Sequence, residues 1–334
     1  MEGQTATPGF LNYIHPATES SLRRNGKVFL RRDGDGSDSG LQGVTQSRQA
    51  VEILDARRLR ETPSLARHGF ELLQRPLADP ALDFYDQQQV LQRYYPECVR
   101  LVEAHTGARA FAFDHNVRSA LGKKTSRRIA GGQQVQEPLH LVHGDYTLTS
   151  GPQRLRDLAR PPGGNDTLRT LLGPGESLIP PELRDRGLAA EGRFAIVNVW
   201  RSIGAEPVAV HPLAVCDNRS VDPSDLVVFE IHYGDRIGEN YFAKPASRHR
   251  WHYYPAMTRD EALLIKQWDS AGTLARSEGR RGDDADADAP TTFTLHSAFE
   301  DPATPADPPD RQSIEVRCLL VYGRRHAWRD RSMR

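Results

Sequence analysis

The sequence predicts a mainly β protein with flanking helices (α+β), built as an antiparallel sandwich or jelly roll. Glycine and proline number 27 and 23 in the 334-residue chain, a content that favours many short elements joined by turns. Six short runs rich in β-branched and aromatic residues fill the second half of the chain. Gly, Pro, Asp or Asn separates them, as is typical of strands in an antiparallel fold. We therefore expect sheets to dominate over helices.

The helices are expected in the first half of the chain. Residues 85–106 carry apolar side chains near helical spacing, and Gly107 can end the helix. Pro96 should break or restart this helix, because proline lacks the amide hydrogen that an inner helical turn needs. A shorter helix is predicted over residues 151–159.

The six expected strands follow one another with short connections. They cover residues 194–200, 225–233, 249–254, 261–268, 292–299 and 313–322. The run at 261–268 could equally be a helical turn, because a short apolar run does not fix its own period. Residues 279–290 are polar and nearly repetitive and predict an exposed loop insertion, whereas the proline-rich residues 300–310 predict an extended connection. All strands belong to a single expected domain, residues 26–325, which follows an N-terminal tail, residues 1–25.

The composition argues against several classes of protein. Lys and Arg number 44, as do Asp and Glu, whereas a nucleic-acid binder or a polybasic membrane anchor would carry a basic excess. The sequence contains no run of about 18 apolar residues and does not begin with a secretory signal, so we expect a cytoplasmic protein. Disulfides and cysteine–zinc sites are disfavoured, because Cys98, Cys216 and Cys318 are far apart and form no C-x-x-C pair.

The most suggestive local motif is LVHGDYT, which places His143 and Asp145 two residues apart. On a strand, side chains i and i+2 point to the same face, so an imidazole and a carboxylate would converge. A second histidine would complete the two-His, one-carboxylate triad of a non-haem Fe(II) centre, which leaves the opposite face of the metal open. Taken alone, H-x-D is a weak signal in a chain with 12 His, and a solvated His143 is the plain alternative.

Two histidines compete for the third ligand position, His296 and His249. Both lie in strand-like runs. We favour His296, because a possible anchor for an anion follows it on the next expected strand. There Arg311 and Ser313 are again i and i+2, and a guanidinium with a neighbouring hydroxyl could grip the distal carboxylate of 2-oxoglutarate. Arg317, six residues further, would share that strand face and is the competing anchor.

The strand at 194–200 ends in a second group of candidate site residues. Asn198 and Trp200 alternate on one face, and Arg201 follows. These three side chains are candidates for contact with the substrate. An equally good interpretation makes Trp200 a core aromatic and Arg201 a cap on the end of the sheet.

Many blocks of the sequence, in order, resemble one family. They include VEILDARR (51–58), TGARAFAFDHNVR (106–118), HGDYT (143–147), CDNRSVDPSDLV (216–227), HRWHYYPAMTRDEALLIKQWDS (249–270) and HSAFEDPATPADPPDRQSIEVR (296–317). From about residue 25 to residue 322 the chain resembles the asaB hydroxylase/desaturase family. Relatives of that family include fungal gibberellin desaturase and the partner protein of the bacterial cephamycin methoxylase.

The resemblance implies an Fe(II)- and 2-oxoglutarate-dependent oxygenase of secondary metabolism on a double-stranded β-helix (jelly-roll, cupin-like) core. Its substrates would be O₂ and a small molecule, hydroxylated or desaturated at an unactivated carbon. Carried over by position, His143, Asp145 and His296 look like the metal ligands, and Arg311 with Ser313 is similar to the Arg-x-Ser pair that binds 2-oxoglutarate.

Two other classes stay open. The chain could be a non-catalytic jelly-roll partner that binds a small molecule or a second biosynthetic enzyme, because one relative works alongside another protein. It could also be a zinc hydrolase that uses the same three ligands. An activity that requires both 2-oxoglutarate and O₂ separates the oxygenase from these alternatives.

Overall fold

The computed structural model describes residues 6–31, 40–132, 134–163, 166–234 and 236–323. Its strands are β1 (Ala6–Ile14), β2 (Phe29–Arg31), β3 (Gln46–Asp55), β4 (Phe70–Gln74), β5 (Arg109–Arg118), β6 (His143–Gly144), β7 (Phe194–Ser202), β8 (Leu213–Cys216), β9 (Leu226–His232), β10 (Ile237–Ala243), β11 (Trp251–Tyr253), β12 (Glu261–Asp269), β13 (His296–Ala298) and β14 (Ser313–Val321). Its α-helices are α1 (Gln87–Gln89), α2 (Tyr95–Thr106), α3 (Ala120–Lys124), α4 (Ser150–Leu158), α5 (Pro181–Leu188) and α6 (Thr273–Arg276). Shorter helical turns are η1 (Ala56–Arg58), η2 (Val90–Tyr94), η3 (Thr167–Thr170), η4 (Asn218–Ser220), η5 (Pro223–Asp225) and η6 (Asp283–Ala285).

The strands form two sheets that pack against each other. A nine-stranded sheet has the order β1-β3-β11-β8-β13-β6-β10-β9-β2, and a five-stranded sheet has the order β4-β12-β7-β14-β5. Most neighbours are antiparallel; β3 with β11 and β2 with β9 are parallel. Trp200 and Ile265 of the smaller sheet share a core with Val215 of the larger one. This is the arrangement of a jelly roll, with a space between the sheets where side chains from both can meet.

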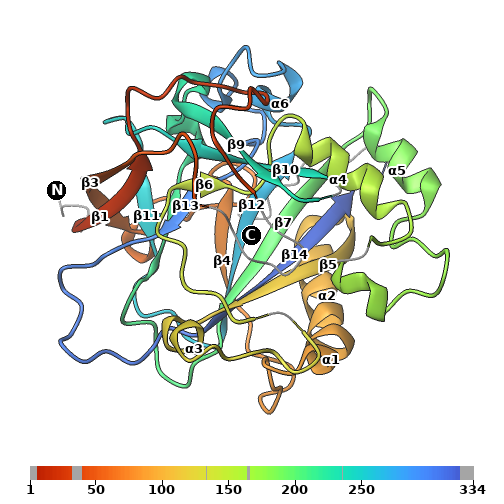
Figure 1. Cartoon of the computed structure of the whole chain (residues 1–334), viewed down its shortest axis with the longest axis horizontal. Coiled ribbons are helices and arrows are strands. Elements are labelled where there is room, and N and C mark those ends of the chain that lie inside the picture. The colour runs from red at the N-terminus through yellow and green to blue at the C-terminus, as the bar shows by residue number, and fades with distance from the viewer. Residues whose placement is uncertain (1–5, 32–39, 133, 164–165, 235, 324–334) are drawn as a thin grey trace.

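Helix α2 covers the outer face of the five-stranded sheet (Figure 1). Along β7 the residues Ala195, Val197 and Val199 belong to the core shared with this helix, so Asn198 and Trp200 point to the opposite face, toward the other sheet. All nine residues of β7 are buried, as expected for a central strand covered on both sides.

The helix expected over 85–106 is present, with the restart that the proline requires. Asp86 caps its start by accepting from the backbone amides of Gln88 and Gln89. A π-helical turn, η2, then leads into α2, and Pro96 sits in the first turn of α2, where the chain passes from the π-helical turn to the α-helix. Gly107 ends the helix in the left-handed region at φ 69°.

The strand expectations hold with three adjustments, one of which is that only Trp251–Tyr253 (β11) of the expected strand 249–254 is a strand. Residues 261–268 form strand β12 rather than a helical turn, because β4 and β7 pair with it on both sides. Of residues 292–299, only the three of β13 are a strand. The predicted short helix is α4.

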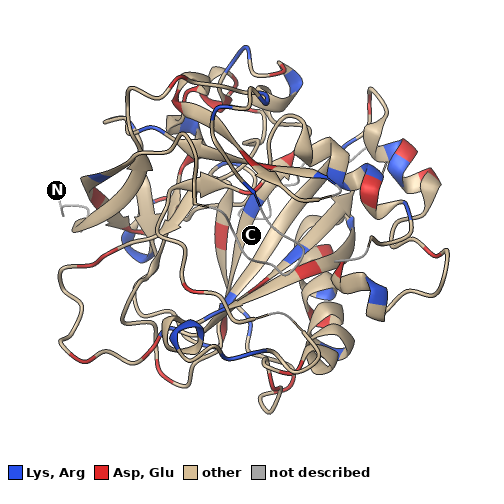
Figure 2. Ribbon diagram, in the orientation of Figure 1, with Lys and Arg blue, Asp and Glu red and all other residues tan. Residues whose placement is uncertain are grey.

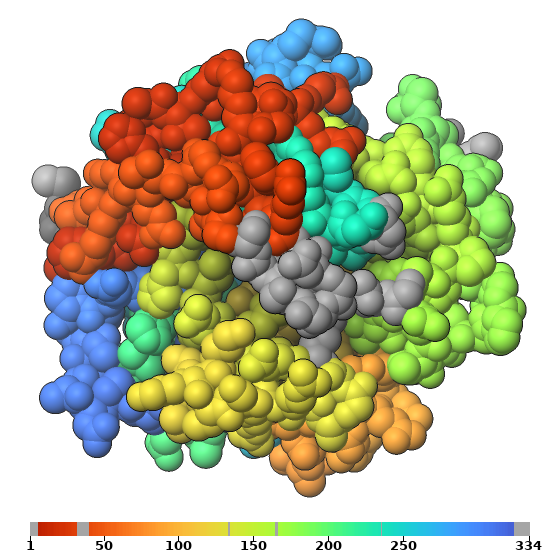
Figure 3. Space-filling model, viewed as in Figure 1, coloured from red at the N-terminus to blue at the C-terminus, as the bar shows by residue number. Residues whose placement is uncertain are grey.

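The expectation of a tail over residues 1–25 is wrong for the residues that the structure describes. Strand β1 pairs with β3 through nine residues, and Leu11 and Tyr13 are buried in the core. Further along, the Ser21 amide donates to the Leu226 carbonyl, and the Asn25 amide donates to the Glu230 carboxylate. In Figure 3 the red N-terminal residues lie against the turquoise region that contains β9. Along TPGFLNYI the side chains alternate between more and less buried positions, as they do in a strand that packs one face on the core; a tail without such packing would show no alternation.

The loop insertion expected at 279–290 is anchored from within. Residues 284–288 are exposed, but Asp283 is buried and accepts from the Asn218 amide, from the backbone amide and hydroxyl of Thr292, and from the Leu274 amide. Burial raises the pKa of Asp283, and these hydrogen bonds oppose the rise. The carboxylate therefore fixes the base of the loop, while its tip faces solvent.

Charged residues of both signs are interspersed along the ribbon (Figure 2). No helix within the described ranges is long and apolar enough to cross a bilayer.

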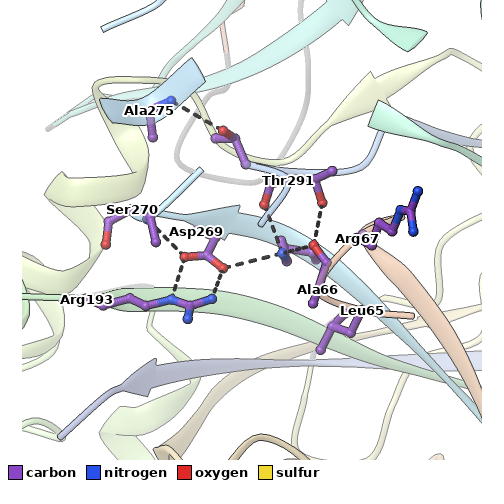
Figure 4. A network of polar contacts seen from close by, with 12 residues as sticks. Leu65, Ala66, Arg67, Arg193, Asp269, Ser270, Ala275 and Thr291 are labelled. Atoms are coloured by element: carbon purple, nitrogen blue, oxygen red, sulfur yellow. Dashed lines mark hydrogen bonds and ion pairs between the residues drawn. The ribbon is translucent and has the colours of Figure 1, made fainter. Parts of the chain in front are cut away.

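A buried ion-pair network joins β12 to the start of β7 (Figure 4). Asp269 accepts from Arg193 at 3.0 and 2.6 Å, and its carboxylate lies 3.4 Å from the Lys266 ammonium. Lys266 also donates to the carbonyls of Ala66 and Thr291 at 3.2 and 2.9 Å. The network thus ties two loops to the five-stranded sheet.

The free energy of unfolding should rise from about pH 8 to about pH 10 because of Lys266. Burial lowers its pKa from 10.5 to about 8, although Asp269 opposes the shift. Between these values the unfolded chain binds more protons than the folded one, so stability increases with pH, here by on the order of 2 kcal/mol. Urea denaturation across this range should show the rise in the native protein and its loss in Lys266→Met. Equal slopes in both proteins would assign the rise to other groups.

Candidate metal centre

His143 and His296 face each other across two paired strands. His143 opens β6, His296 opens β13, and the two residues are direct antiparallel partners. Their ring centroids are 4.2 Å apart, and both side chains are buried between the sheets. Strand pairing thus brings together two histidines that are 153 residues apart in the sequence.

Asp145 lies in a bend directly after β6 and completes the group. Its Oδ1 is 3.6 Å from His143 Nε2 and 3.9 Å from His296 Nε2. Ligand atoms of the three residues all lie within 4.8 Å of one another. Among the described residues, this is the one group of three or more His, Cys, Asp or Glu side chains that is so arranged.

The backbone fixes which nitrogen each imidazole presents. His143 Nδ1 lies 2.8 Å from the Leu141 carbonyl, and His296 Nδ1 lies 3.1 Å from the Thr294 carbonyl. A carbonyl only accepts, so both Nδ1 atoms carry the proton and both Nε2 lone pairs point to the shared centre. Burial, together with His296, lowers the pKa of His143 to about 3. His143 is therefore neutral at physiological pH, as a metal ligand must be.

Asp145 keeps its negative charge in this buried place. Burial would raise its pKa, but the Arg317 guanidinium, the two imidazoles and the Asn198 amide together hold the pKa of the carboxyl well below its usual value. The group therefore offers two imidazole Nε2 atoms and one carboxylate on one side of a common point, which is the donor set of a non-haem iron facial triad.

Arg311 is a buried cation that forms no ion pair with a carboxylate of the described residues. Arg311 is 3% exposed, its Nη1 donates to the His211 carbonyl, and its guanidinium lies 5.5 Å from the centre of the Trp200 ring. Its Nε and the hydroxyl of Ser313 have no hydrogen-bond partner in the described protein. Burial and the nearby Arg118 lower the pKa of Arg311 to about 9. A buried, poorly compensated cation beside an unpaired hydroxyl suits an anionic ligand.

Comparison with known proteins shows the family to which this chain belongs. The family model described as YDMC, Oxidoreductase/YMDC permease-like domain, matches residues 11–172 and 176–321. The alpha-ketoglutarate-dependent dioxygenase phiK of a fungus (Fungal sp., strain ATCC 74256) is 30% identical over 324 residues, which cover 96% of this chain and 97% of phiK. The chain belongs to this oxidoreductase family, among the 2-oxoglutarate-dependent dioxygenases.

Two further similarities concern a bacterial relative and the fold of this dioxygenase. The "uncharacterized protein in dcmA 3'region" of Methylophilus leisingeri is 42% identical over 194 residues, which cover 58% of this chain and 89% of that protein. The solved structure of the iron and alpha-ketoglutarate-dependent endoperoxidase NvfI superposes with a TM-score of 0.69 and 23% identity, over 96% of this chain and 99% of NvfI. The latter likeness confirms the jelly-roll fold.

The residues present in this dioxygenase fit both Fe(II) and 2-oxoglutarate. The two Nε2 atoms and Asp145 Oδ1 are not engaged in hydrogen bonds with described backbone atoms, and they point to a common centre, as iron requires. The unpaired Arg311 Nε and Ser313 hydroxyl provide donors for a carboxylate.

The structure does not bring His249 to this group. His249 Nε2 lies 3.1 Å from Asp225, and its Nδ1 lies 3.1 Å from the Tyr13 hydroxyl. Tyr13 in turn accepts from the Trp251 indole at 2.7 Å. Both ring nitrogens of His249 are thus engaged in a network that joins β1, β11 and the turn η5. The expectation that His249 is an alternative third ligand is therefore corrected: its contacts are those of a structural residue.

Arg317 is close to the metal centre but differs from Arg311 in its partners. Its Nε, Nη1 and Nη2 contact the carboxylates of Asp145, Asp114 and Glu315 at 3.3, 3.2 and 3.0 Å. Because carboxylates of the protein already surround it, Arg317 is a poorer anchor for 2-oxoglutarate than Arg311.

The three residues expected to contact the substrate do not all lie on the same face of β7. Asn198 donates to Asp145 Oδ2 at 3.2 Å, and Trp200 lies against Arg311. Arg201 points to the opposite face of β7, where it bonds the Tyr94 hydroxyl and two backbone carbonyls beneath α2. The expectation that Arg201 lines the pocket is therefore corrected, and its role is to bind loops to the sheet.

Two site-facing residues, Glu315 and Gln267, were not anticipated from the sequence. Glu315 lies between Ser313 and Arg317 on β14, so strand alternation could have identified it. Its carboxylate accepts from Asn116 at 3.2 Å. Gln267 accepts from the Asp145 amide at 3.3 Å, and the β-bulge next to it in β12 gives no signal in the sequence.

Proposed function

We propose that His143, Asp145 and His296 hold Fe(II), and that Arg311 with Ser313 holds the distal carboxylate of 2-oxoglutarate. The proposed reaction is hydroxylation or desaturation of an unactivated carbon in a small secondary metabolite, with O₂ as co-substrate. The observation that supports it best is the combination of a convergent His–Asp–His group with a buried guanidinium, just before β14, whose Nε has no hydrogen-bond partner among the described residues.

The bound iron and 2-oxoglutarate would supply the oxidising power from O₂, with succinate and carbon dioxide as co-products. The side chains of the protein bind and orient. The carbonyls of Leu141 and Thr294 aim the imidazoles, and the side chains of all three ligands are at most 8% exposed, which keeps bulk water away. Trp200 lies against Arg311 and would form one wall for the co-substrate.

Within this class, we propose the narrower asaB hydroxylase/desaturase grouping. Its support is the set of sequence blocks named above, which runs from β3 to β14 in the same order. We further propose that β1 to β14 act as a single oxygenase domain, because the proposed metal ligands lie on or directly after strands of one sheet, whereas Ser313 of the proposed 2-oxoglutarate anchor opens β14 of the other.

Anaerobic addition of Fe(II) and then 2-oxoglutarate to the full chain tests the proposal. We expect a weak visible charge-transfer band and, in air, slow conversion of 2-oxoglutarate to succinate. His143→Ala should show neither, and Arg67→Ala, an exposed arginine paired with Glu61, should match the native protein. A colourless native complex would favour the non-catalytic partner. A hydrolytic activity that needs neither 2-oxoglutarate nor O₂ would favour the zinc hydrolase.

A further inference from the structure

The two oxygens of the Asp145 carboxylate have different surroundings. Oδ1 faces the Nε2 atoms of His143 and His296 at 3.6 and 3.9 Å. Oδ2 faces away from them, where the Asn198 amide lies at 3.2 Å and Arg317 Nε at 3.3 Å. One oxygen is therefore available to a metal, and the other is held by two donors of the protein.

These donors belong to a single row across the five-stranded sheet. Arg317 on β14 is the direct partner of Asn198 on β7 and of Asp114 on β5. Cross-strand neighbours on one face are held at a fixed spacing by the backbone ladder. Asp145 itself follows β6 of the nine-stranded sheet. Arg317 and Asn198 thus contact, across the space between the sheets, a residue that directly follows a strand of the opposite sheet.

The orientation of Arg317 is itself fixed. Besides Asp145, its guanidinium contacts Asp114 at 3.2 Å and Glu315 at 3.0 Å, and its side chain is only 13% exposed. Each of its three nitrogens thus faces a different carboxylate. A planar guanidinium held at three points cannot turn without breaking several contacts, so Nε stays directed at Oδ2.

From this geometry we infer that Arg317 and Asn198 are positioning residues that keep Asp145 a one-oxygen ligand of the metal, an inference that rests on the proposed function. A carboxylate free to rotate could bind iron through both oxygens and occupy a position that 2-oxoglutarate or O₂ needs. Two donors on Oδ2 oppose that rotation. Residues that orient metal ligands in this way typically contribute 10- to 100-fold, in order of magnitude, to metal affinity.

Anaerobic Fe(II) titration of the full chain tests the inference, followed by titration of 2-oxoglutarate at saturating iron. In Arg317→Met, Fe(II) affinity should fall by roughly 10- to 100-fold, and the visible band of the iron–2-oxoglutarate complex should shift. The affinity for 2-oxoglutarate at saturating iron should fall as well, because a carboxylate bound through both oxygens would occupy one of the positions that 2-oxoglutarate needs. Asn198→Ala removes one hydrogen bond from an uncharged donor and should weaken Fe(II) binding by about 3- to 10-fold. This variant still tests the inference if Arg317→Met does not fold.

Arg118→Gln is the matched control. Arg118 lies 3.6 Å from Glu315 and belongs to the same buried group, but it does not contact Asp145, so its removal should leave Fe(II) affinity unchanged. The inference is overturned if both variants bind Fe(II) like the native protein, or if Arg317→Met weakens only 2-oxoglutarate binding, which would make Arg317 the anchor. A native protein that binds no Fe(II) would instead overturn the proposed function, and this inference with it.

Discussion

His296→Ala is expected to lower Fe(II) affinity by on the order of 100-fold or more, because it removes one of three ligands rather than a supporting contact. Asp145→Ala should have the same effect. His249→Ala should leave Fe(II) binding intact, since both nitrogens of His249 serve the contacts with Asp225 and Tyr13. Isothermal titration with Fe(II) under nitrogen measures all three variants.

Thermal unfolding provides the control for this comparison. His249→Ala leaves the Asp225 carboxylate and the Tyr13 hydroxyl short of a partner, so it should lower the melting temperature more than His296→Ala does. The opposite pattern, in which His249→Ala loses the metal and His296→Ala keeps it, would assign the third ligand to His249.

Arg311→Ala should leave Fe(II) affinity nearly unchanged and weaken 2-oxoglutarate binding by on the order of 2–5 kcal/mol, because the carboxylate would enter a desolvated site without its cation. Arg311→Lys should restore part of this loss, since an ammonium keeps the charge but not the forked geometry. Ser313→Ala should have a smaller effect of about 1 kcal/mol, as a single hydroxyl contact does.

Titration of 2-oxoglutarate at saturating Fe(II), followed through the visible band, measures these affinities. The kinetic counterpart is a raised KM for 2-oxoglutarate that excess co-substrate overcomes. An Arg311→Ala protein that binds 2-oxoglutarate as tightly as the native one would move the anchor to another cation of the site.

The sequence predicted the two candidate ligands of the H-x-D motif, but not the contacts around them. The H-x-D spacing identified His143 and Asp145, because that relation is local. The choice between His296 and His249 depends on which strand lies beside β6, a long-range pairing that no local pattern encodes. In the same way, Arg311 and Arg317 are equivalent by strand spacing, and only the carboxylates brought in by β5 and β6 distinguish them.

Arg201 was misplaced for a different reason. Strand alternation puts residues 198 and 200 on one face and residue 201 on the other, so the sequence already contained the correction. The alternation was hard to use, because every residue of β7 is buried and polar side chains on both faces of the strand look equally suited to a pocket. Arg201 can be buried on the side of β7 that faces α2 because its guanidinium donates hydrogen bonds to two backbone carbonyls there.

The pairing of β1 with β3 bears on how shortened versions of this protein would behave. A chain that starts at residue 26 would lose Leu11 and Tyr13 from the core and would leave β3 with a row of unsatisfied backbone groups along one side. Such an exposed edge invites pairing between molecules. We expect size-exclusion chromatography to show aggregates for that shortened chain and a single species for the full one.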